Sequence, residues 1–191
     1  MLNIPNFLTL LRIIAIPIFL IFLTDERIGM ALLVFVLAGI TDSLDGAIAR
    51  LTNTRTTLGA YMDPLADKML ILSAFVAFAS MDVIPRWLTV VVISRDVIIL
   101  IGYLSLFLLT QRLMEIRPSA ISKAATFLHL VTVSVVLLSL WHEGEPSQRI
   151  RSSLFAITGI VTAVSGFHYI FRGLRWYQHA GGPPGAAAPS R

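Results

Sequence analysis

The chain of 191 residues contains no cysteine. Disulfide scaffolds, thiolate metal sites and cysteine nucleophiles are therefore excluded, whereas the redox compartment stays open. A serine and a histidine at a spacing typical of a nucleophile and its base are also lacking. This absence disfavours a mechanism with a covalent enzyme intermediate.

Charged residues are scarce as well, at 14% of the chain against 56% hydrophobic residues. The mean hydropathy of +0.81 lies far above the range of soluble proteins. Because each bilayer crossing needs about 20 apolar residues, roughly six crossings would use most of the chain and leave no room for a separate soluble domain. The net charge of +4 comes mainly from arginine and suits contact with anionic lipid, so nucleic acid is not an expected partner.

Polar residues divide the sequence into six apolar stretches joined by short connections, and such short loops favour antiparallel neighbouring helices. The stretches are Asn6–Leu23, Met30–Arg50, Leu58–Met81, Trp87–Thr110, Ser122–Trp141 and Ile150–Phe171. They predict an all-α, polytopic membrane protein with six transmembrane helices. Internal repeats with periods of roughly 20–50 residues are not apparent, which gives no support to a solenoid or a repeat-built transporter.

We expect one membrane domain over residues 1–172 and a disordered tail over residues 173–191. The tail is rich in glycine, proline and alanine and cannot bury enough surface to order itself. Six crossings place both termini on one side, and the loops on that side contain Arg55, Arg112 and Arg117. The positive-inside rule makes that side cytoplasmic, so we expect an integral membrane protein with both termini in the cytoplasm.

Four aspartates border the connection between the second and third stretches. Helical spacing puts Asp42 and Asp45 on one face of the second helix, and Asp63 and Asp67 on one face of the third. Counted back from the connection, both pairs fall at a depth of roughly 8–13 Å. Antiparallel pairing of the two helices therefore predicts that the four carboxylates converge.

Four ionised aspartates in a membrane would repel one another, and each costs about 2.5–3.5 kcal/mol at the bilayer centre. Two divalent cations, Mg²⁺ or Mn²⁺, would neutralise them and keep open positions for a phosphate. The small residues Gly46, Ala49 and Gly59 leave room for a ligand beside the carboxylates. Arg50 offers a donor fork for a phosphate, and Thr56 offers a hydroxyl.

Three other interpretations compete with a metal–phosphate site. An ion or proton transporter would also place carboxylates in the membrane, but it leaves the small residues and Arg50 unexplained. An aspartate-rich membrane prenyltransferase binds metal pyrophosphate between helices with a different pattern. Simple pairing of the aspartates with Arg50 and Arg55 near the loop does not account for the matched spacing of the four carboxylates.

The complete pattern resembles the signature of the CDP-alcohol phosphatidyltransferase family, and every signature position matches. It reads Asp42-x2-Asp45-Gly46-x2-Ala49-Arg50-x8-Gly59-x3-Asp63-x3-Asp67. The resemblance extends over roughly residues 1–170. The opening from Asn3 to Arg12 is similar to phosphatidylglycerophosphate and cardiolipin synthases.

The resemblance implies a six-helix homodimer with a polar cavity near the cytoplasmic interface, where two metal ions hold the pyrophosphate of CDP-diacylglycerol. It implies that Asp42, Asp45, Asp63 and Asp67 are metal ligands and that Asp67 is also the general base on the acceptor hydroxyl. The residues implied to border the CDP group are Asp42, Gly46, Ala49, Arg50, Thr56 and Gly59. The implied reaction is attack of an alcohol on the lipid-side phosphorus with release of CMP.

Two cations are candidates for binding a phosphate on the acceptor alcohol, Arg95 and Lys123. The alternatives are an ion pair between Arg95 and the adjacent Asp96, and extension of Lys123 to the interface. The segments around both residues resemble cardiolipin synthases, which use phosphatidylglycerol. Phosphatidylglycerophosphate synthases, which use glycerol-3-phosphate, typically have an arginine where this chain has Gly102. This departure counts against glycerol-3-phosphate without excluding it, so both acceptors stay open.

Overall fold

A computed structural model describes residues 4–52, 57–110, 119–142 and 148–179. For residues 4–10, 42–52 and 57–67, among others, the description covers the helical backbone and not the side chains. The described residues form six helices and no strand: α1 (Ile4–Thr24), α2 (Ile28–Thr52), α3 (Thr57–Ser80), α4 (Arg86–Thr110), α5 (Ala120–Trp141) and α6 (Gln148–His179). The all-α prediction is confirmed.

Each helix coincides with one predicted apolar stretch, and most ends agree within a few residues. The main difference is at the end of α6, which continues through His179, beyond the predicted beginning of the tail at residue 173. The physical reason is that Gly173 is the only glycine or proline between residues 172 and 181, and one glycine costs a helix only about 1 kcal/mol.

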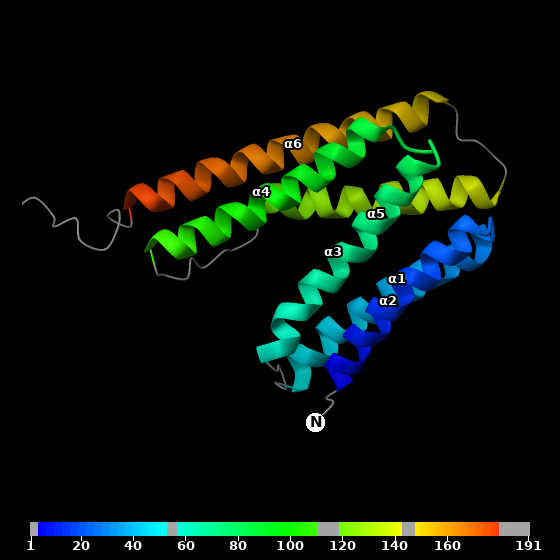
Figure 1. Cartoon of the computed structure of the whole chain (residues 1–191), viewed down its shortest axis with the longest axis horizontal. Coiled ribbons are helices and arrows are strands. Elements are labelled where there is room, and N and C mark those ends of the chain that lie inside the picture. Colours follow the sequence, from blue (N-terminus) through cyan, green and yellow to red (C-terminus); the bar gives the residue numbers. More distant parts are fainter. Residues whose placement is uncertain (1–3, 53–56, 111–118, 143–147, 180–191) are drawn as a thin grey trace, which may run out of the picture.

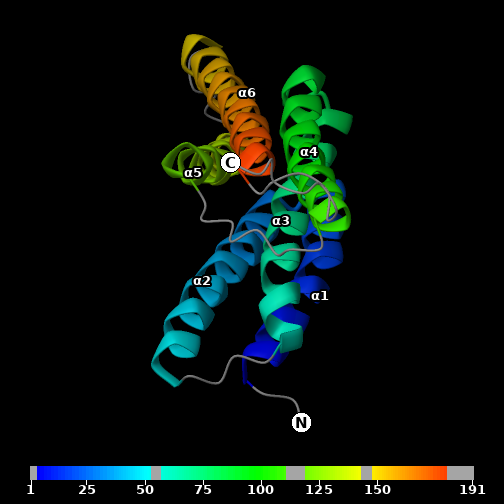
Figure 2. The same ribbon diagram turned by 90° about the vertical axis from the view of Figure 1, so that its left-hand side faces the viewer.

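The six helices alternate in direction along the chain (Figure 1). α1 packs against both α2 and α3, while α6 packs against α4 and α5. In Figure 2, α1 and α2 lie mainly in the lower half of the view and α4, α5 and α6 in the upper half, while α3 runs between the two halves. Contacts of α3 with α4 and α5, and of α2 with α5, join the two groups. The end of α2 and the beginning of α3 lie at the same end of the molecule as the beginning of α1 (Figures 1 and 2).

The two tight turns at the opposite end of the molecule have the same construction. In α1, the N–H of Arg27 donates to the carbonyl of Phe22, with Glu26 at φ 60°. In α3, the N–H of Val83 donates to the carbonyl of Phe78, with Asp82 at φ 54°. Both are Schellman-type helix ends, which satisfy the last carbonyl groups of a helix and reverse the chain.

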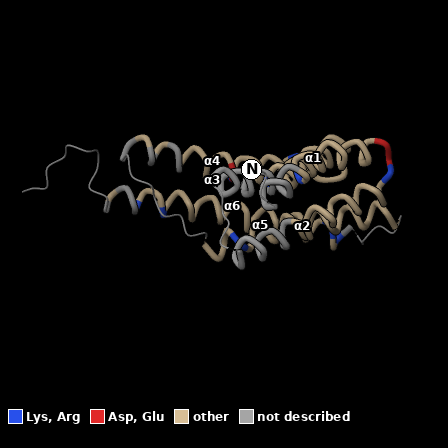
Figure 3. The backbone as a smooth tube through the Cα atoms, turned by 90° about the horizontal axis from the view of Figure 1, so that it is seen from below, with Lys and Arg blue, Asp and Glu red and all other residues tan. Residues whose placement is uncertain are grey.

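Apolar side chains fill the interior and also cover much of the outer surface. The buried core includes Phe19, Phe75, Phe78 and Leu88. Large apolar side chains are exposed on every helix, and examples are Ile21, Leu33, Val76, Leu100, Phe127, Ile160 and Phe171. Apart from the turns, few charges interrupt the tubes of Figure 3. An apolar exterior of this extent is typical of a surface that contacts lipid.

Within the described residues, two stretches are long and apolar enough to cross a membrane, Ala120–Trp141 and Arg149–Arg175. Shorter apolar stretches occupy Leu11–Thr24, Ile28–Thr41 and Lys68–Ser80. The structure thus contains apolar helices that fit a membrane protein.

The contact between α4 and α6 at Gly159 leaves no room for a methyl group unless the ring of Trp87 shifts. A Cβ atom at Gly159 would lie 2.5 Å from Cζ3 of Trp87 and 2.9 Å from Cη2. We therefore expect Gly159→Ala to lower the free energy of unfolding by about 1–3 kcal/mol, as overpacking does elsewhere. The measurement is thermal unfolding in detergent.

Gly102 is the matched control, because nothing lies within 4 Å of a Cβ atom at that position of α4. Gly102→Ala should leave stability unchanged or raise it slightly. Trp87→Phe removes the two ring atoms that clash, so it should recover most of the loss caused by Gly159→Ala. Equal stability of the two alanine variants would contradict the close contact.

Candidate active site

The predicted aspartate motif occupies two helical segments that the fold brings to one end of the molecule. Residues 42–52 continue α2 to its end, and residues 57–67 form the first part of α3. Thr56 lies outside the described residues. The structure describes only the helical backbone of Asp42, Asp45, Gly46, Ala49, Arg50, Gly59, Asp63 and Asp67. Their roles therefore stay predictions, supported by a backbone that is helical on both sides of the connection.

An ionic cluster begins one residue after the motif, between α3 and α4. Lys68 Nζ lies 3.1 Å from Asp96 Oδ1, and Arg95 Nη1 lies 2.5 Å from the same oxygen. The side chains of Arg95 and Asp96 are 4% and 13% exposed, whereas that of Lys68 is 43% exposed. Two cations share one carboxylate, which leaves one positive charge in excess.

The same arginine joins α4 to the last two helices. Arg95 Nη2 donates to the hydroxyl oxygens of Ser122 on α5 and Ser165 on α6, the latter at 3.2 Å. Gly166 on α6 lies against the aliphatic part of the Arg95 side chain, with its Cβ position 3.6 Å from Cγ. Arg95 therefore ties α4, α5 and α6 together, and Asp96 extends the tie to Lys68 on α3.

These contacts answer one alternative that the sequence left open, because Arg95 does pair with Asp96. Lys123 follows Ser122 at the start of α5, and its side chain is exposed. Ser119 caps this helix, since its hydroxyl accepts a hydrogen bond of 3.2 Å from the N–H of Ser122. The structure thus places Arg95 inside the helix bundle and Lys123 at its surface.

A second group of buried polar contacts joins α5 and α6. His129 Nε2 is 2.8 Å from the Thr162 hydroxyl, and the Thr132 and Thr158 hydroxyls are 2.9 Å apart. The ring of Phe75 on α3 meets the His129 ring edge to face at 5.6 Å. With a hydrogen-bond partner and apolar packing, His129 is a helix-packing residue, and interhelical hydrogen bonds of this type stabilise membrane helices modestly.

Sequence reasoning did not single out Lys68, Ser122 or Ser165 as members of the site. The signal for Lys68 was present, since a lysine in the middle of an apolar helix needs a counter-ion. The partners of that lysine could not be read from the sequence, because the pair joins two helices whose relative rotation depends on the packed structure. Serine is too common in membrane helices to indicate such a contact by itself.

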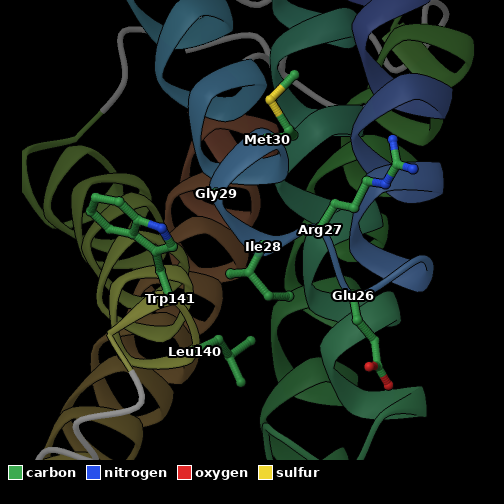
Figure 4. Close-up of a pocket in the computed structure, with 7 residues that line it drawn as sticks. All are labelled: Glu26, Arg27, Ile28, Gly29, Met30, Leu140 and Trp141. Carbon is green, nitrogen blue, oxygen red and sulfur yellow. The ribbon is translucent and has the colours of Figure 1, made fainter.

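A surface hollow of about 410 Å³ lies between the turn from α1 to α2 and the end of α5 (Figure 4). The motif lies at the other end of α2. The lining of the hollow comes from the turn between α1 and α2 and from the end of α5, including Glu26, Arg27 and Trp141. None of the predicted site residues lines it, so it is not the candidate active site. Among the side chains that the structure describes, no group of three or more acidic or histidine residues could hold a metal ion.

Comparison with known proteins identifies the family. A family model described as CDP-alcohol phosphatidyltransferase matches residues 2–167, which include the whole motif from Asp42 to Asp67 and the cluster of Lys68, Arg95 and Asp96. The chain belongs to the CDP-alcohol phosphatidyltransferase family. This assignment favours group transfer over the transporter and prenyltransferase alternatives, and it confirms the resemblance drawn from the motif.

Relatives within the family carry the names of two kinds of synthase. The human protein named "Cardiolipin synthase (CMP-forming)" is 35% identical over 194 residues, covering 92% of this chain and 63% of the human protein. The Mycobacterium tuberculosis H37Rv protein named "Probable phosphatidylglycerophosphate synthase" is 33% identical over 180 residues, covering 91% and 82%. The Bacillus subtilis protein named "CDP-diacylglycerol--glycerol-3-phosphate 3-phosphatidyltransferase" is 34% identical over 154 residues, covering 72% and 78%. The chain therefore spans less than two thirds of the human relative.

Proposed function

We propose that this protein transfers a phosphatidyl group from CDP-diacylglycerol to a phosphate-bearing glycerol acceptor and releases CMP. The acceptor is glycerol-3-phosphate or phosphatidylglycerol, and the product is an anionic phospholipid. The observation that carries this proposal is the match of the family model across the complete aspartate motif. The names of the human, mycobacterial and Bacillus relatives support the same donor chemistry and both acceptors.

The donor set of the motif fits divalent metal ions, which this family uses. Asp42, Asp45, Asp63 and Asp67 supply carboxylate oxygens, the ligands that Mg²⁺ and Mn²⁺ prefer. The backbone brings both acidic segments to one end of the molecule. We propose that these four residues hold two Mg²⁺ or Mn²⁺ ions, which when bound would stabilise negative charge on the pyrophosphate of the donor.

The remaining motif residues would hold the nucleotide part of the donor. We propose that Gly46, Ala49 and Gly59 leave space for CDP. Arg50 and Thr56 would donate hydrogen bonds to the CDP group. Asp42 would border the CDP group and contact it through the metal ion that it holds. Fixing the donor between two helices aligns its phosphorus with the attacking hydroxyl of the acceptor. This alignment lowers the activation barrier of the transfer.

Asp67 is proposed as the general base of the transfer. Its carboxylate would accept the proton of the acceptor hydroxyl while that oxygen forms a bond to the lipid-side phosphorus. The bond from this phosphorus to the CMP oxygen breaks, so CMP leaves with the electron pair. Proton removal by a positioned base contributes typically ~10²–10⁴-fold to a rate.

Arg95 and Lys123 are proposed to attract the phosphate of the acceptor. A guanidinium offers several N–H donors to a phosphate, and Arg95 lies inside the helix bundle in the part of the chain that the family model matches. Because Arg95 is held by Asp96, Ser122 and Ser165, we propose that it acts from a fixed position. Lys123 is exposed and adjoins Ser122 in the chain, so it is available for a second contact.

We further propose six membrane crossings, a homodimer, a polar cavity that opens at the cytoplasmic side, and a location in a bacterial inner membrane. The alternation of the six helices and their apolar exterior support the six crossings. The homodimer rests on the family resemblance, and light scattering of the purified protein tests it, since a monomeric mass would exclude it.

Introduced cysteines can test the topology without interference, because the chain has none of its own. We expect an impermeant thiol reagent applied to intact cells to label Glu26→Cys in the turn between α1 and α2. The same reagent should not label Thr54→Cys or Ser190→Cys until the membrane is opened, because both positions would be cytoplasmic. The reverse pattern of labelling would overturn the proposed orientation.

The test of the proposed function is acceptor profiling with CMP release as the readout. Purified protein with CDP-diacylglycerol and Mg²⁺ or Mn²⁺ is offered glycerol-3-phosphate, phosphatidylglycerol, inositol phosphate and serine separately. We expect CMP release with one of the first two acceptors. Release with serine alone would show that the acceptor is not a phosphate-bearing glycerol.

A further inference from the structure

We infer that Lys68 is a positioning residue for phosphatidyl transfer, acting through Asp96 to fix the rotation of α3 about its axis. The inference rests on the proposed function, because the helix that it positions carries Asp63 and Asp67. It adds a role that the aspartate motif and the acceptor cations do not assign. The starting observation is that Lys68 directly follows Asp67 and pairs with α4 at 3.1 Å.

The pair joins the middle of one helix to the middle of another. Lys68 and Asp96 each lie about 15–21 Å from either end of their helices, counted at 1.5 Å per residue. Extension of the lysine to an interface is therefore difficult, and a charge at that depth needs a partner. Asp96 is that partner, and its carboxylate is held in place by the buried Arg95.

Arg95 makes this anchor rigid because it is itself bound on two further helices. Its Nη2 donates to Ser122 on α5 and Ser165 on α6, and its side chain is 4% exposed. Asp96 is therefore fixed relative to three helices, and Lys68 is the group through which α3 is tied to them. A lysine that merely neutralised a surface carboxylate would have no such support.

The position of Lys68 along α3 gives the pair its effect on the motif. In the described part of α3, buried apolar packing begins at Leu70 and continues through Phe75 and Phe78. The Thr89 hydroxyl of α4 also donates to the carbonyl of Phe75, at 3.1 Å. Of these described contacts, the ion pair of Lys68 is the one nearest to Asp67. Neighbouring residues of a helix differ by about 100° in direction. Fixing the direction of position 68 therefore fixes the directions in which positions 63 and 67 face.

Loss of the pair should therefore affect the chemical step more than substrate binding. We expect Lys68→Gln to lower kcat for CMP release about tenfold or more, because small displacements of catalytic groups are costly. The KM values for CDP-diacylglycerol and the acceptor should stay within about twofold, as for a group that touches neither substrate. Lys68→Arg keeps the charge and should restore most of kcat.

A double-mutant cycle separates action through Asp96 from direct contact with substrate. If Lys68 acts through Asp96, Lys68→Gln should cause little further loss in an Asp96→Asn background. If the kcat losses of the two single variants multiply in the double variant, the inference is overturned. A large rise of the acceptor KM with unchanged kcat would overturn it as well. Arg86→Gln is the matched control, because Arg86 pairs with Asp82 at the same 3.1 Å but at the exposed beginning of α4. This variant should keep the wild-type kcat.

A distance measurement tests the inference independently of turnover. Spin labels are placed at Met69→Cys on α3 and Phe127→Cys on α5, two exposed positions, in the full chain in lipid nanodiscs. We expect Lys68→Gln and Asp96→Asn to broaden the distance distribution equally, with no effect of Arg86→Gln. A distribution that Lys68→Gln leaves unchanged would refute the positioning role even if CMP is released. Conversely, a wild-type protein that releases no CMP refutes the proposed function, whatever the labels report.

Discussion

Replacing Asp67 by asparagine should reduce CMP release by at least ~10²–10⁴-fold at saturating substrate, the loss typical of removing a general base. Asparagine keeps the size of the side chain and one coordinating oxygen, so binding of the CDP-lipid should largely survive. Higher metal concentration should not restore the rate, because the missing function is proton removal. The measurement is steady-state CMP release, with nucleotide binding measured separately.

Asp42→Asn should behave differently, since Asp42 is proposed to hold metal without removing a proton. This variant should bind CDP-lipid more weakly, and part of its defect should be recovered by raising the concentration of Mg²⁺ or Mn²⁺. Asp82→Asn is the control for the substitution itself, because Asp82 is exposed in a turn outside the motif. Near-normal turnover of Asp67→Asn would eliminate Asp67 as the base and direct attention to Asp63.

Removal of divalent metal should abolish turnover. Four carboxylates need cations to coexist and to hold a pyrophosphate, and metal stabilisation of transition-state charge amounts to several kcal/mol. At about 1.4 kcal/mol per factor of ten, excess EDTA should lower CMP release by about 10²-fold or more. Adding back Mg²⁺ or Mn²⁺ should restore it.

Chelation should also lower the unfolding temperature of the purified protein, because a ligand that binds only the native state stabilises it. This shift should be absent in a variant in which Asp42, Asp45, Asp63 and Asp67 are all replaced by asparagine. Full activity in excess EDTA would contradict the two-metal site. A shift of equal size in the fourfold variant would show that the metal acts elsewhere on the protein.

The order and bounds of the helices could be predicted because they depend on local sequence. Polar punctuation marks the turns, and Glu26 and Asp82 lie where Schellman-type ends stop α1 and α3. The end of α6 differs from the prediction because the composition of residues 173–191 as a whole predicts a disordered tail, whereas its glycine, proline and alanine are concentrated from residue 180 onward. In the structure the helix continues to His179, so composition alone was a poor guide to that boundary.

The candidate site could be predicted only where its residues lie close together in the sequence. The motif from Asp42 to Asp67 was visible because its spacing follows the periodicity of two adjacent helices. The contacts of Arg95 with Ser122 and Ser165 join residues on separate helices and depend on how those helices rotate against one another. Such contacts are set by packing of the whole bundle, which a single sequence does not specify.

The most direct test of the central claim is to follow the phosphatidyl group itself. CDP-diacylglycerol labelled in its acyl chains is incubated with the purified protein, metal ion and either glycerol-3-phosphate or phosphatidylglycerol, and lipid products and CMP are quantified together. The account predicts that label appears in phosphatidylglycerophosphate or cardiolipin in equal molar amount to the CMP released, and that Asp67→Asn lowers both equally. Release of CMP with the label only in phosphatidic acid, or no release with either acceptor, would contradict it.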